Sequence, residues 1–153
     1  MRRKDKEITD VEVIESIMKE AMFCRIAVCE DNKPYIIPMN YSFKDNYLYL
    51  HTGKEGKKID ILKKNNNVSF EVDIKSEVVV GAAPCNWTMK FYSVIGFGKS
   101  SFVDDIDEKK DILNIIMKKY SGKSDFQFPD AAINELAIIK VKVSEITGKK
   151  SKY

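Results

Sequence analysis

The sequence predicts a mainly β, α+β fold in which helices cover the outside and the ends of an antiparallel barrel. Short stretches of alternating apolar and polar residues, typical of half-buried strands, recur along the chain and are joined by tight turns. Such turns require antiparallel pairing, because parallel strands need crossover connections of about a dozen residues. Two longer segments have apolar residues at helical spacing and indicate amphipathic helices. We expect the sheet to close or nearly close, since closure removes exposed strand edges.

The expected elements follow one another with short connections. They are a first helix with a capping box from Thr9 to Glu12, strands over 23–29, 35–43 and 47–51, a short helix between Gly53 and 65–67, strands over 68–72, 77–82 and 90–103, a helix from 104–105 to about 120, and a strand over 136–146. The first three strands should form a meander. Gly96 and Gly98 indicate a bulge or a sharp bend in the strand that contains them.

The composition suits one ordinary domain and argues against several partners. The 153 residues are expected to form a single domain over 1–153, with 44% hydrophobic residues to build its core. No apolar run approaches the ~20 residues that cross a bilayer, and a charged helix follows the basic start where a signal peptide would be apolar. Three cysteines without redox or metal spacing indicate reduced thiols in a cytoplasmic protein. A well-mixed net charge of +3 gives little reason to expect nucleic acid or a membrane as partner.

The segment HTGKEGKK, residues 51–58, carries the strongest chemical signal. It leaves a strand, passes two glycines and enters a helix with Lys57 and Lys58 in its first turn. Glycines let backbone N–H groups converge, a helix N-terminus is the positive end of a dipole, and the lysines add full charges. Thr52 can add its hydroxyl. Because the spacings of the Walker A loop and of GxGxxG are absent, the segment suits a monophosphate, and an ordinary solvated turn is the alternative.

Four segments, in their order and spacing, resemble the FMN-binding split barrels related to pyridoxamine 5′-phosphate oxidase, and among these the nitroimidazole-resistance (Nim) group. The segments are RIAV at 25–28, PYIIPMNY at 34–41, LYLHTGKEGKKIDILKKN at 48–65 and WTMKFYSVIGFGK at 87–99. The resemblance covers nearly the whole chain. It implies a six-stranded antiparallel Greek-key split barrel with peripheral helices, which forms a homodimer and holds FMN in clefts at the subunit interface.

The resemblance also implies where the cofactor is bound. The ribityl phosphate is expected at the strand-to-helix segment, the isoalloxazine ring along a strand backbone, and further contacts from the partner subunit. The expected contacts of the phosphate are Thr52, Gly53, Lys57 and Lys58, and those of the ring are Pro38, Met39 and Asn40. The expected contacts from the partner subunit are Trp87 and Tyr92. His51 matches a histidine near the flavin or substrate in the Nim group, so it is the preferred catalytic candidate.

Some of these residues have structural alternatives. Trp87, the one tryptophan, could equally anchor the core or a dimer. His51 is the one histidine, and a single histidine at a strand end is most often structural, with a nitrogen bonded to a nearby carbonyl. A lone histidine also argues against a His-based metal site or a Ser-His-Asp triad. Arg25 interrupts an apolar strand and needs a partner.

The predicted function is that of an FMN-dependent oxidoreductase that takes electrons from NADH, NADPH or another reductant and passes them to a small acceptor such as a nitroimidazole. The alternative is a non-catalytic protein that binds or stores flavin or haem, because a fold does not determine a function. Pyridoxamine-phosphate oxidation is less favoured, because the ending ITGKKSKY lacks the arginine-rich end associated with that enzyme. A nucleic-acid binder is disfavoured, since one phosphate explains the lysines around 54–64.

Overall fold

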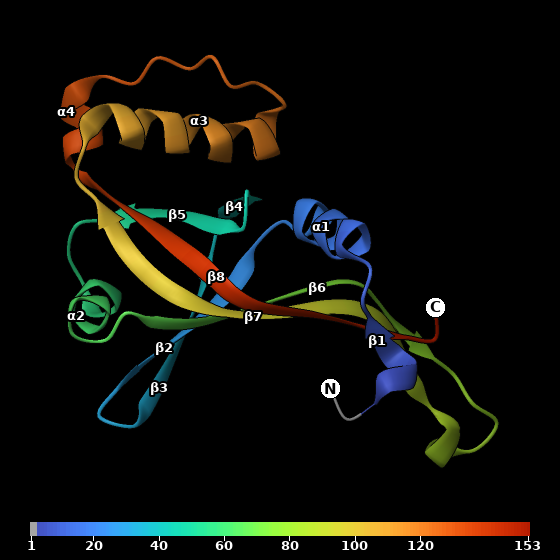
Figure 1. The fold of residues 1–153 in the computed structure, drawn as a ribbon. Helices are drawn as coiled ribbons and strands as arrows, with labels where there is room; N and C mark the ends of the chain where they lie inside the picture. Colours follow the sequence, from blue (N-terminus) through green and yellow to red (C-terminus); the bar gives the residue numbers. More distant parts are fainter. Residues whose placement is uncertain (1–2) are drawn as a thin grey trace.

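A computed structural model describes residues 3–153 and shows one antiparallel sheet that curls into a split barrel (Figure 1). Within these residues the strand order is β3-β2-β6-β7-β8-β5-β4, and the short β1 pairs with β8. The strands are β1 (Glu7–Ile8), β2 (Cys24–Glu30), β3 (Lys33–Met39), β4 (Tyr41–Lys44), β5 (Tyr47–Gly53), β6 (Asn67–Val79), β7 (Thr88–Val103) and β8 (Leu136–Ser151). The helices are α1 (Val11–Glu20), α2 (Lys57–Lys64), α3 (Ile106–Ser121) and α4 (Asp130–Asn134), with single turns η1 (Lys4–Lys6) and η2 (Pro84–Asn86).

The observed architecture confirms the predicted fold class. Strands β3 and β4 form the two ends of the strand order, yet only Asn40 separates them in the chain, so the sheet nearly closes on itself. If β3 and β4 are counted as one interrupted strand, the described residues contain the six long strands that were predicted, and β1 is an addition. Helix α2 carries the chain from β5 to β6, which are not neighbours in the sheet. None of the helices within 3–153 is long and apolar enough to span a membrane.

The predicted three-stranded meander is wrong, because its middle strand is divided into β3 and β4. The expected strand over 35–43 is interrupted at Asn40, so β3 pairs with β2 while β4 pairs with β5. The two turns of the meander are confirmed, since Asp31-Asn32 and Asp45-Asn46 all have φ values between 49° and 63°. Such left-handed pairs favour two-residue hairpins. The hairpins are thus local, whereas the bend at Asn40 places the two halves of one apolar stretch at opposite ends of the sheet.

Other boundaries also differ from the prediction. Strand β6 runs continuously through the expected strands 68–72 and 77–82, with an irregularity between Ile74 and Glu77. The N-cap of α1 is Asp10, whose carboxylate accepts from the Glu12 amide, so Thr9 is not the cap. Helix α4 was not expected, and β8 extends beyond the predicted end at 146. The predicted irregularity of β7 is confirmed, since its register with β8 shifts between Phe97 and Gly98.

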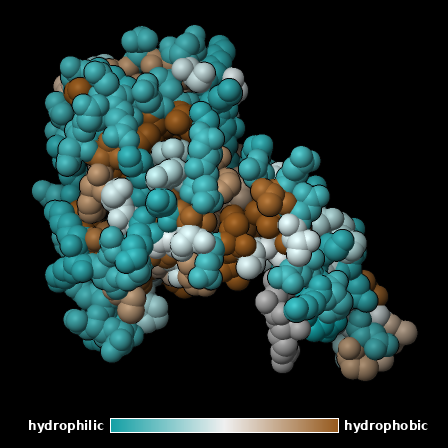
Figure 2. Space-filling model, viewed as in Figure 1, coloured by the Kyte–Doolittle hydropathy of each residue, from teal (hydrophilic) through white to brown (hydrophobic). Residues whose placement is uncertain are grey.

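The core consists of two clusters on opposite faces of the sheet. The larger cluster fills the barrel and includes Leu48, Leu50, Phe70 and residues of α1 and α2. The smaller cluster lies under α3 and α4 and includes Ile138. Beyond the barrel, the end of β6 and the start of β7 continue as an arm, which runs to the lower right in Figure 1. Brown and tan side chains gather at the tip of this arm in Figure 2, so hydrophobic surface is exposed there.

Candidate functional site

The strand-to-helix junction forms as predicted between β5 and α2. Strand β5 ends at Gly53, and Gly56 is the N-cap of α2 with φ 112° and ψ 165°. A residue with a side chain is strained at such a φ, which explains the glycine. The carbonyl of Gly56 accepts from the amides of Ile59 and Asp60, while the preceding amides lack intrahelical acceptors, as at any helix start. The helix therefore presents free donors and the positive end of its dipole next to the glycines.

The lysines at the two ends of α2 differ in their surroundings. At the last turn, Lys64 Nζ lies 2.6 Å from Glu30 Oε1 and is neutralised by it. At the first turn, Lys57 and Lys58 form no ion pair among residues 3–153; Lys57 Nζ lies instead 4.7 Å from the centroid of the Tyr35 ring. Asp60, also in the first turn, offsets part of this positive charge. The unneutralised cations thus stand at the helix end that attracts anions.

The structure places His51 on the opposite face of β5 from Thr52. His51 pairs with Ile138 of β8, which belongs to the cluster under α3 and α4, whereas Leu50 and Thr52 alternate to the barrel side. The Nδ1 atom of His51 is buried and has no hydrogen-bond partner within the described residues. Burial lowers the pKa of His51 below its ordinary value of 6.5. A structural histidine bonded to a carbonyl was the alternative, and this unpaired Nδ1 does not fit it.

We expect the single histidine to titrate below pH 6.5, because burial penalises its charged form. The unfolded state would then bind more protons below pH 6.5, so the free energy of unfolding should decrease as pH falls from 6.5 through the lowered pKa. The imidazole C–H signals in NMR report the pKa without ambiguity, and His51→Gln should remove this component of the acid destabilisation. A measured pKa at or above 6.5 would contradict the burial of the ring.

Residues 38–40 lie where the sheet leaves backbone groups unpaired. Strand β3 is an edge strand, so one side of its backbone faces no other strand in the described chain. Met39 is buried opposite Cys24 of β2, while Pro38 and Asn40 are exposed. Since β4 begins one residue later and pairs Tyr41 with Leu50, the break at Asn40 lies close to the β5 segment that leads into the junction. The free edge can supply donors and acceptors to a flat ligand.

Trp87 and Tyr92 are not brought to the junction within one chain. Trp87 follows η2 at the tip of the arm and is 53% exposed. Tyr92 lies on the arm nearer the barrel, and its ring stacks on that of Tyr153 at a centroid distance of 4.2 Å. Helix α2 and the tip of the arm lie on opposite sides of the molecule in Figure 1. These two residues can reach a junction only if it belongs to a second subunit.

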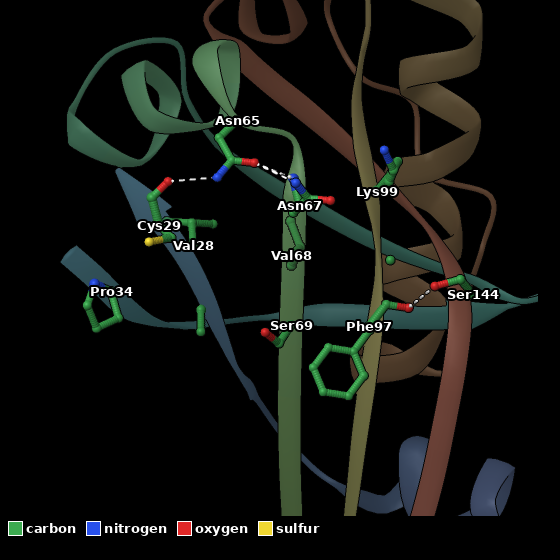
Figure 3. Close-up of a pocket in the computed structure, with 12 residues that line it drawn as sticks. Val28, Cys29, Pro34, Asn65, Asn67, Val68, Ser69, Phe97, Lys99 and Ser144 are labelled. Carbon is green, nitrogen blue, oxygen red and sulfur yellow. Dashed lines mark hydrogen bonds between the residues drawn. The ribbon is translucent and has the colours of Figure 1, made fainter. Parts of the chain in front are cut away.

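The outer face of the sheet has a groove that the sequence did not predict. One part, of about 310 Å³, crosses β2, β6 and β7, with Cys29, Asn65 and Phe97 among its lining residues (Figure 3). A second part, of about 290 Å³, shares Ala27 and Ser69 with it and continues to Ile36 and Ile95. None of the predicted cofactor contacts lines either part. The signal in the sequence was the apolar residues at outward positions of the alternating strand β7.

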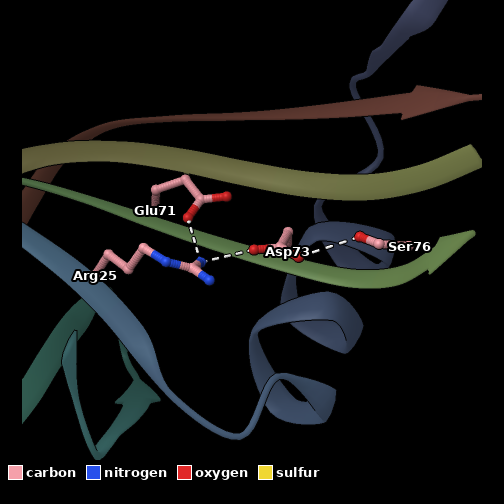
Figure 4. A network of polar contacts seen from close by, with 4 residues as sticks. All are labelled: Arg25, Glu71, Asp73 and Ser76. Carbon is pink, nitrogen blue, oxygen red and sulfur yellow. Dashed lines mark hydrogen bonds and ion pairs between the residues drawn. The ribbon is translucent and has the colours of Figure 1, made fainter. Parts of the chain in front are cut away.

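A charged network borders this groove. Arg25 Nη1 lies 2.9 Å from Glu71 Oε2 and 2.7 Å from Asp73 Oδ1, and the hydroxyl of Ser76 donates to Asp73 (Figure 4). The two carboxylates raise the pKa of Arg25, with the hydrogen bond to Asp73 as the largest cause. Arg25 therefore has the partners that the sequence required, and both carboxylates are engaged in binding it.

The comparisons with known proteins agree with this fold. The family model described as pyridoxamine 5′-phosphate oxidase matches residues 10–150, and the chain belongs to that family, in its split-barrel form. A candidate 5-nitroimidazole antibiotic resistance protein from Bacteroides thetaiotaomicron is 36% identical, with a TM-score of 0.84, and the match covers 94% of this chain and 85% of that one. The chain is thus similar to the nitroimidazole-resistance group, as its sequence segments predicted.

More distant solved structures share the fold. The flavocytochrome Anf3 from Azotobacter vinelandii is 15% identical with a TM-score of 0.87, over 100% of this chain and 72% of that one. A FAD-binding protein from Mesorhizobium loti is 21% identical with a TM-score of 0.70, over 96% and 98% of the two chains. The uncharacterized protein RA0666 of Rhizobium meliloti (strain 1021) is 33% identical over 61 residues, so the match spans only 40% of that curated relative.

Proposed function

We propose that the protein is an FMN-dependent oxidoreductase that transfers electrons from NADH or NADPH to a small acceptor, a nitroaromatic compound such as a 5-nitroimidazole. The observation that carries the proposal is the first turn of α2, where Lys57 and Lys58 have no carboxylate partner within residues 3–153 and follow the positive-φ Gly56. The name of the B. thetaiotaomicron protein, to which this chain is 36% identical, supports the choice of acceptor.

The donor set at the junction suits the phosphate of FMN. The free amides at the start of α2, the hydroxyl of Thr52 and the two lysines would hold a dianionic monophosphate next to Gly53. FAD would need a second set of donors for its other phosphate. The segment between β5 and α2 offers one helix start, which favours FMN, although a related fold carries a protein named as FAD-binding.

The flavin ring would lie along the free edge of β3. There, backbone groups of Pro38, Met39 and Asn40 can bond its polar rim. His51 would be the catalytic candidate, since its Nδ1, on the face of β5 under α3 and α4, is the one polar side-chain atom in 3–153 that is buried without a partner. When bound, FMN supplies the hydride and electron transfer chemistry. The chain's own residues hold the phosphate, orient the ring and limit the access of water.

A second copy of the chain would complete the site. The outer groove exposes Ile36, Ile95 and Phe97, with 63%, 44% and 47% of their surface accessible, and such a contiguous apolar face is typical of an interface. The arm would then bring Trp87 and Tyr92 to the partner's junction. Since the three cysteines form no disulfide within the described residues, the proposal places this homodimer in the cytoplasm.

The visible spectrum of the purified protein tests the cofactor. We expect flavin bands near ~450 nm, and the cofactor released by heat should chromatograph as FMN. A Soret band would instead favour haem, and release of FAD would correct the choice of flavin. A colourless protein that binds no added FMN would overturn the proposal.

Coupled oxidation of NADH or NADPH with a 5-nitroimidazole tests the activity. At saturating FMN, the protein should oxidise the nicotinamide faster than free FMN does, and only when the acceptor is present. If a flavin-loaded protein gives no acceleration with either nicotinamide, the protein is a flavin-binding protein without this activity. The spectrum and the rate thus separate the cofactor proposal from the enzymatic one.

A further inference from the structure

A second cavity lies between α1, β4 and α3, apart from the junction and the outer groove. Its volume is about 330 Å³, within the lower range of small-molecule sites. Its lining consists of three apolar side chains, one hydroxyl and four lysines: Met18, Phe43, Ile115, Ser42, Lys19, Lys44, Lys118 and Lys119. No acidic residue lines it. We call this cavity the lysine pocket.

Ser42 places a hydroxyl in the wall of the lysine pocket. The residue is only 7% exposed, and its hydroxyl makes no hydrogen bond to any of residues 3–153. A serine hydroxyl both donates and accepts hydrogen bonds, so it needs a partner from water or from a ligand. Since Ser42 lines the lysine pocket, a ligand there can supply that partner.

Lys119 is a partly buried cation that forms no ion pair with a carboxylate in the described part of the chain. Its Nζ donates to the carbonyl of Met18 at 2.8 Å and lies 3.5 Å from the centroid of the Tyr41 ring. These contacts leave donor capacity on the ammonium, which carries three protons. Burial lowers the pKa of Lys119 to about 8, and the nearby Cys24 offsets only part of this effect. An anion in the lysine pocket would remove the penalty for charging this side chain.

The other lysines of the pocket are weakly neutralised. Lys19 lies 3.5 Å from Glu15, and Lys44 lies 3.8 Å from Asp45, both pairs being exposed to solvent. Lys118 has no ion pair within the described chain. Exposed pairs of this kind are screened by solvent and contribute little. The rim therefore keeps most of its positive charge.

We propose that the lysine pocket binds a small amphiphilic anion. The apolar body of the ligand would lie against Met18, Phe43 and Ile115, and its carboxylate or phosphate would be held by Lys118, Lys119 and the Ser42 hydroxyl. The pocket shares no residue with the junction, so it is separate from the flavin site. A neutral nitroimidazole lacks the charge that this lining requires, so the ligand differs from the proposed electron acceptor.

Titration of the full-length protein, saturated with FMN if it binds FMN, tests the proposal with defined probes. Octanoate and hexyl phosphate present the two head groups on similar bodies, while octanol and inorganic phosphate present the body and the head alone. We expect amide shifts in NMR at residues 42–44 and 115–119, and an affinity for one of the two amphiphiles at least about tenfold above octanol and inorganic phosphate. The tighter amphiphile identifies the head group.

Two variants locate the site. Lys118→Glu should weaken the better amphiphile by about tenfold or more, whereas Lys123→Glu, in the exposed segment after α3, makes the same charge change away from the pocket and should not. Ser42→Ala should weaken it to a lesser extent. Flavin affinity should be unchanged in all three variants. The proposal would be overturned if neither octanoate nor hexyl phosphate bound more tightly than octanol and inorganic phosphate. An unchanged affinity in Lys118→Glu, or shifts confined to other residues, would also overturn it.

Discussion

Replacing both Lys57 and Lys58 by alanine is expected to weaken FMN binding by about 10²- to 10⁴-fold. A hydrogen bond to a charged group contributes about 1.5–3 kcal/mol, and the variant removes two such donors from the first turn of α2. Without a phosphate, Lys57 already interacts with the ring of Tyr35. Losing this contact on binding would reduce the net contribution of Lys57 to FMN affinity. The upper end of the range therefore applies only if both lysines turn fully to the phosphate.

Quenching of flavin fluorescence measures this affinity directly. The matched control is Lys63→Ala with Lys123→Ala, which removes the same net charge from two other exposed positions. It should change FMN affinity by less than about threefold, because exposed charges at a distance are screened by salt. Similar losses in the two double variants would mean that the lysines act only through net charge. Full affinity in the first would show that the phosphate lies elsewhere.

Gly98→Ala is expected to lower the free energy of unfolding by about 1–3 kcal/mol or more. A Cβ at this position would meet the carbonyl oxygen of Lys142 and would lie 2.9 Å from Cγ1 of Val141. The clash with a backbone atom arises at the register shift between β7 and β8, where the strands approach closely. Since a paired backbone cannot turn aside like a side chain, the strands themselves must separate. Chemical denaturation of variant and parent measures the difference.

Two other glycines serve as controls for this prediction. At Gly96 a Cβ would meet the ring of Phe70, so Gly96→Ala should also destabilise, but Phe70→Leu in the same chain should restore part of the loss. At Gly53 no atom lies within 4 Å of the added Cβ, and Gly53→Ala should leave stability within about 0.5 kcal/mol. If Gly98→Ala proved as stable as Gly53→Ala, the bend would not depend on that glycine.

Much of the strand-to-helix junction, the proposed phosphate site, was predictable because its parts are adjacent in the chain. Residues 51–58 leave a strand, pass Gly53 and Gly56 and start a helix, and each step depends on local backbone preferences. The structure confirms this arrangement of elements. It also shows two features that adjacency in the chain does not reveal. His51 and Thr52 are consecutive but lie on opposite faces of β5. Among the lysines of α2, the one that pairs with Glu30 is Lys64, at the end of the helix away from the junction.

The residues outside the junction were harder to assign. Their roles depend on elements distant in sequence, such as the arm that carries Trp87 or the three elements that enclose the lysine pocket. Ser42 and Lys119 are separated by about half of the chain, and neither belongs to a sequence motif. Their significance comes from their place together in the wall of one cavity, a property that only the packed molecule has.

The sequence by itself determined the type of each main element, the two Asp-Asn hairpin turns, the bend near Gly98 and the lysine-rich start of α2. Alternation, helical spacing and left-handed turn residues act within a few positions, so a linear pattern records them. Only the tertiary structure decided that the strand over 35–43 divides at Asn40, that β3 becomes a free edge, and that the Nδ1 of His51 is buried without a partner. These outcomes depend on which distant strands pair and what each side chain then contacts, and no short stretch of sequence carries that information.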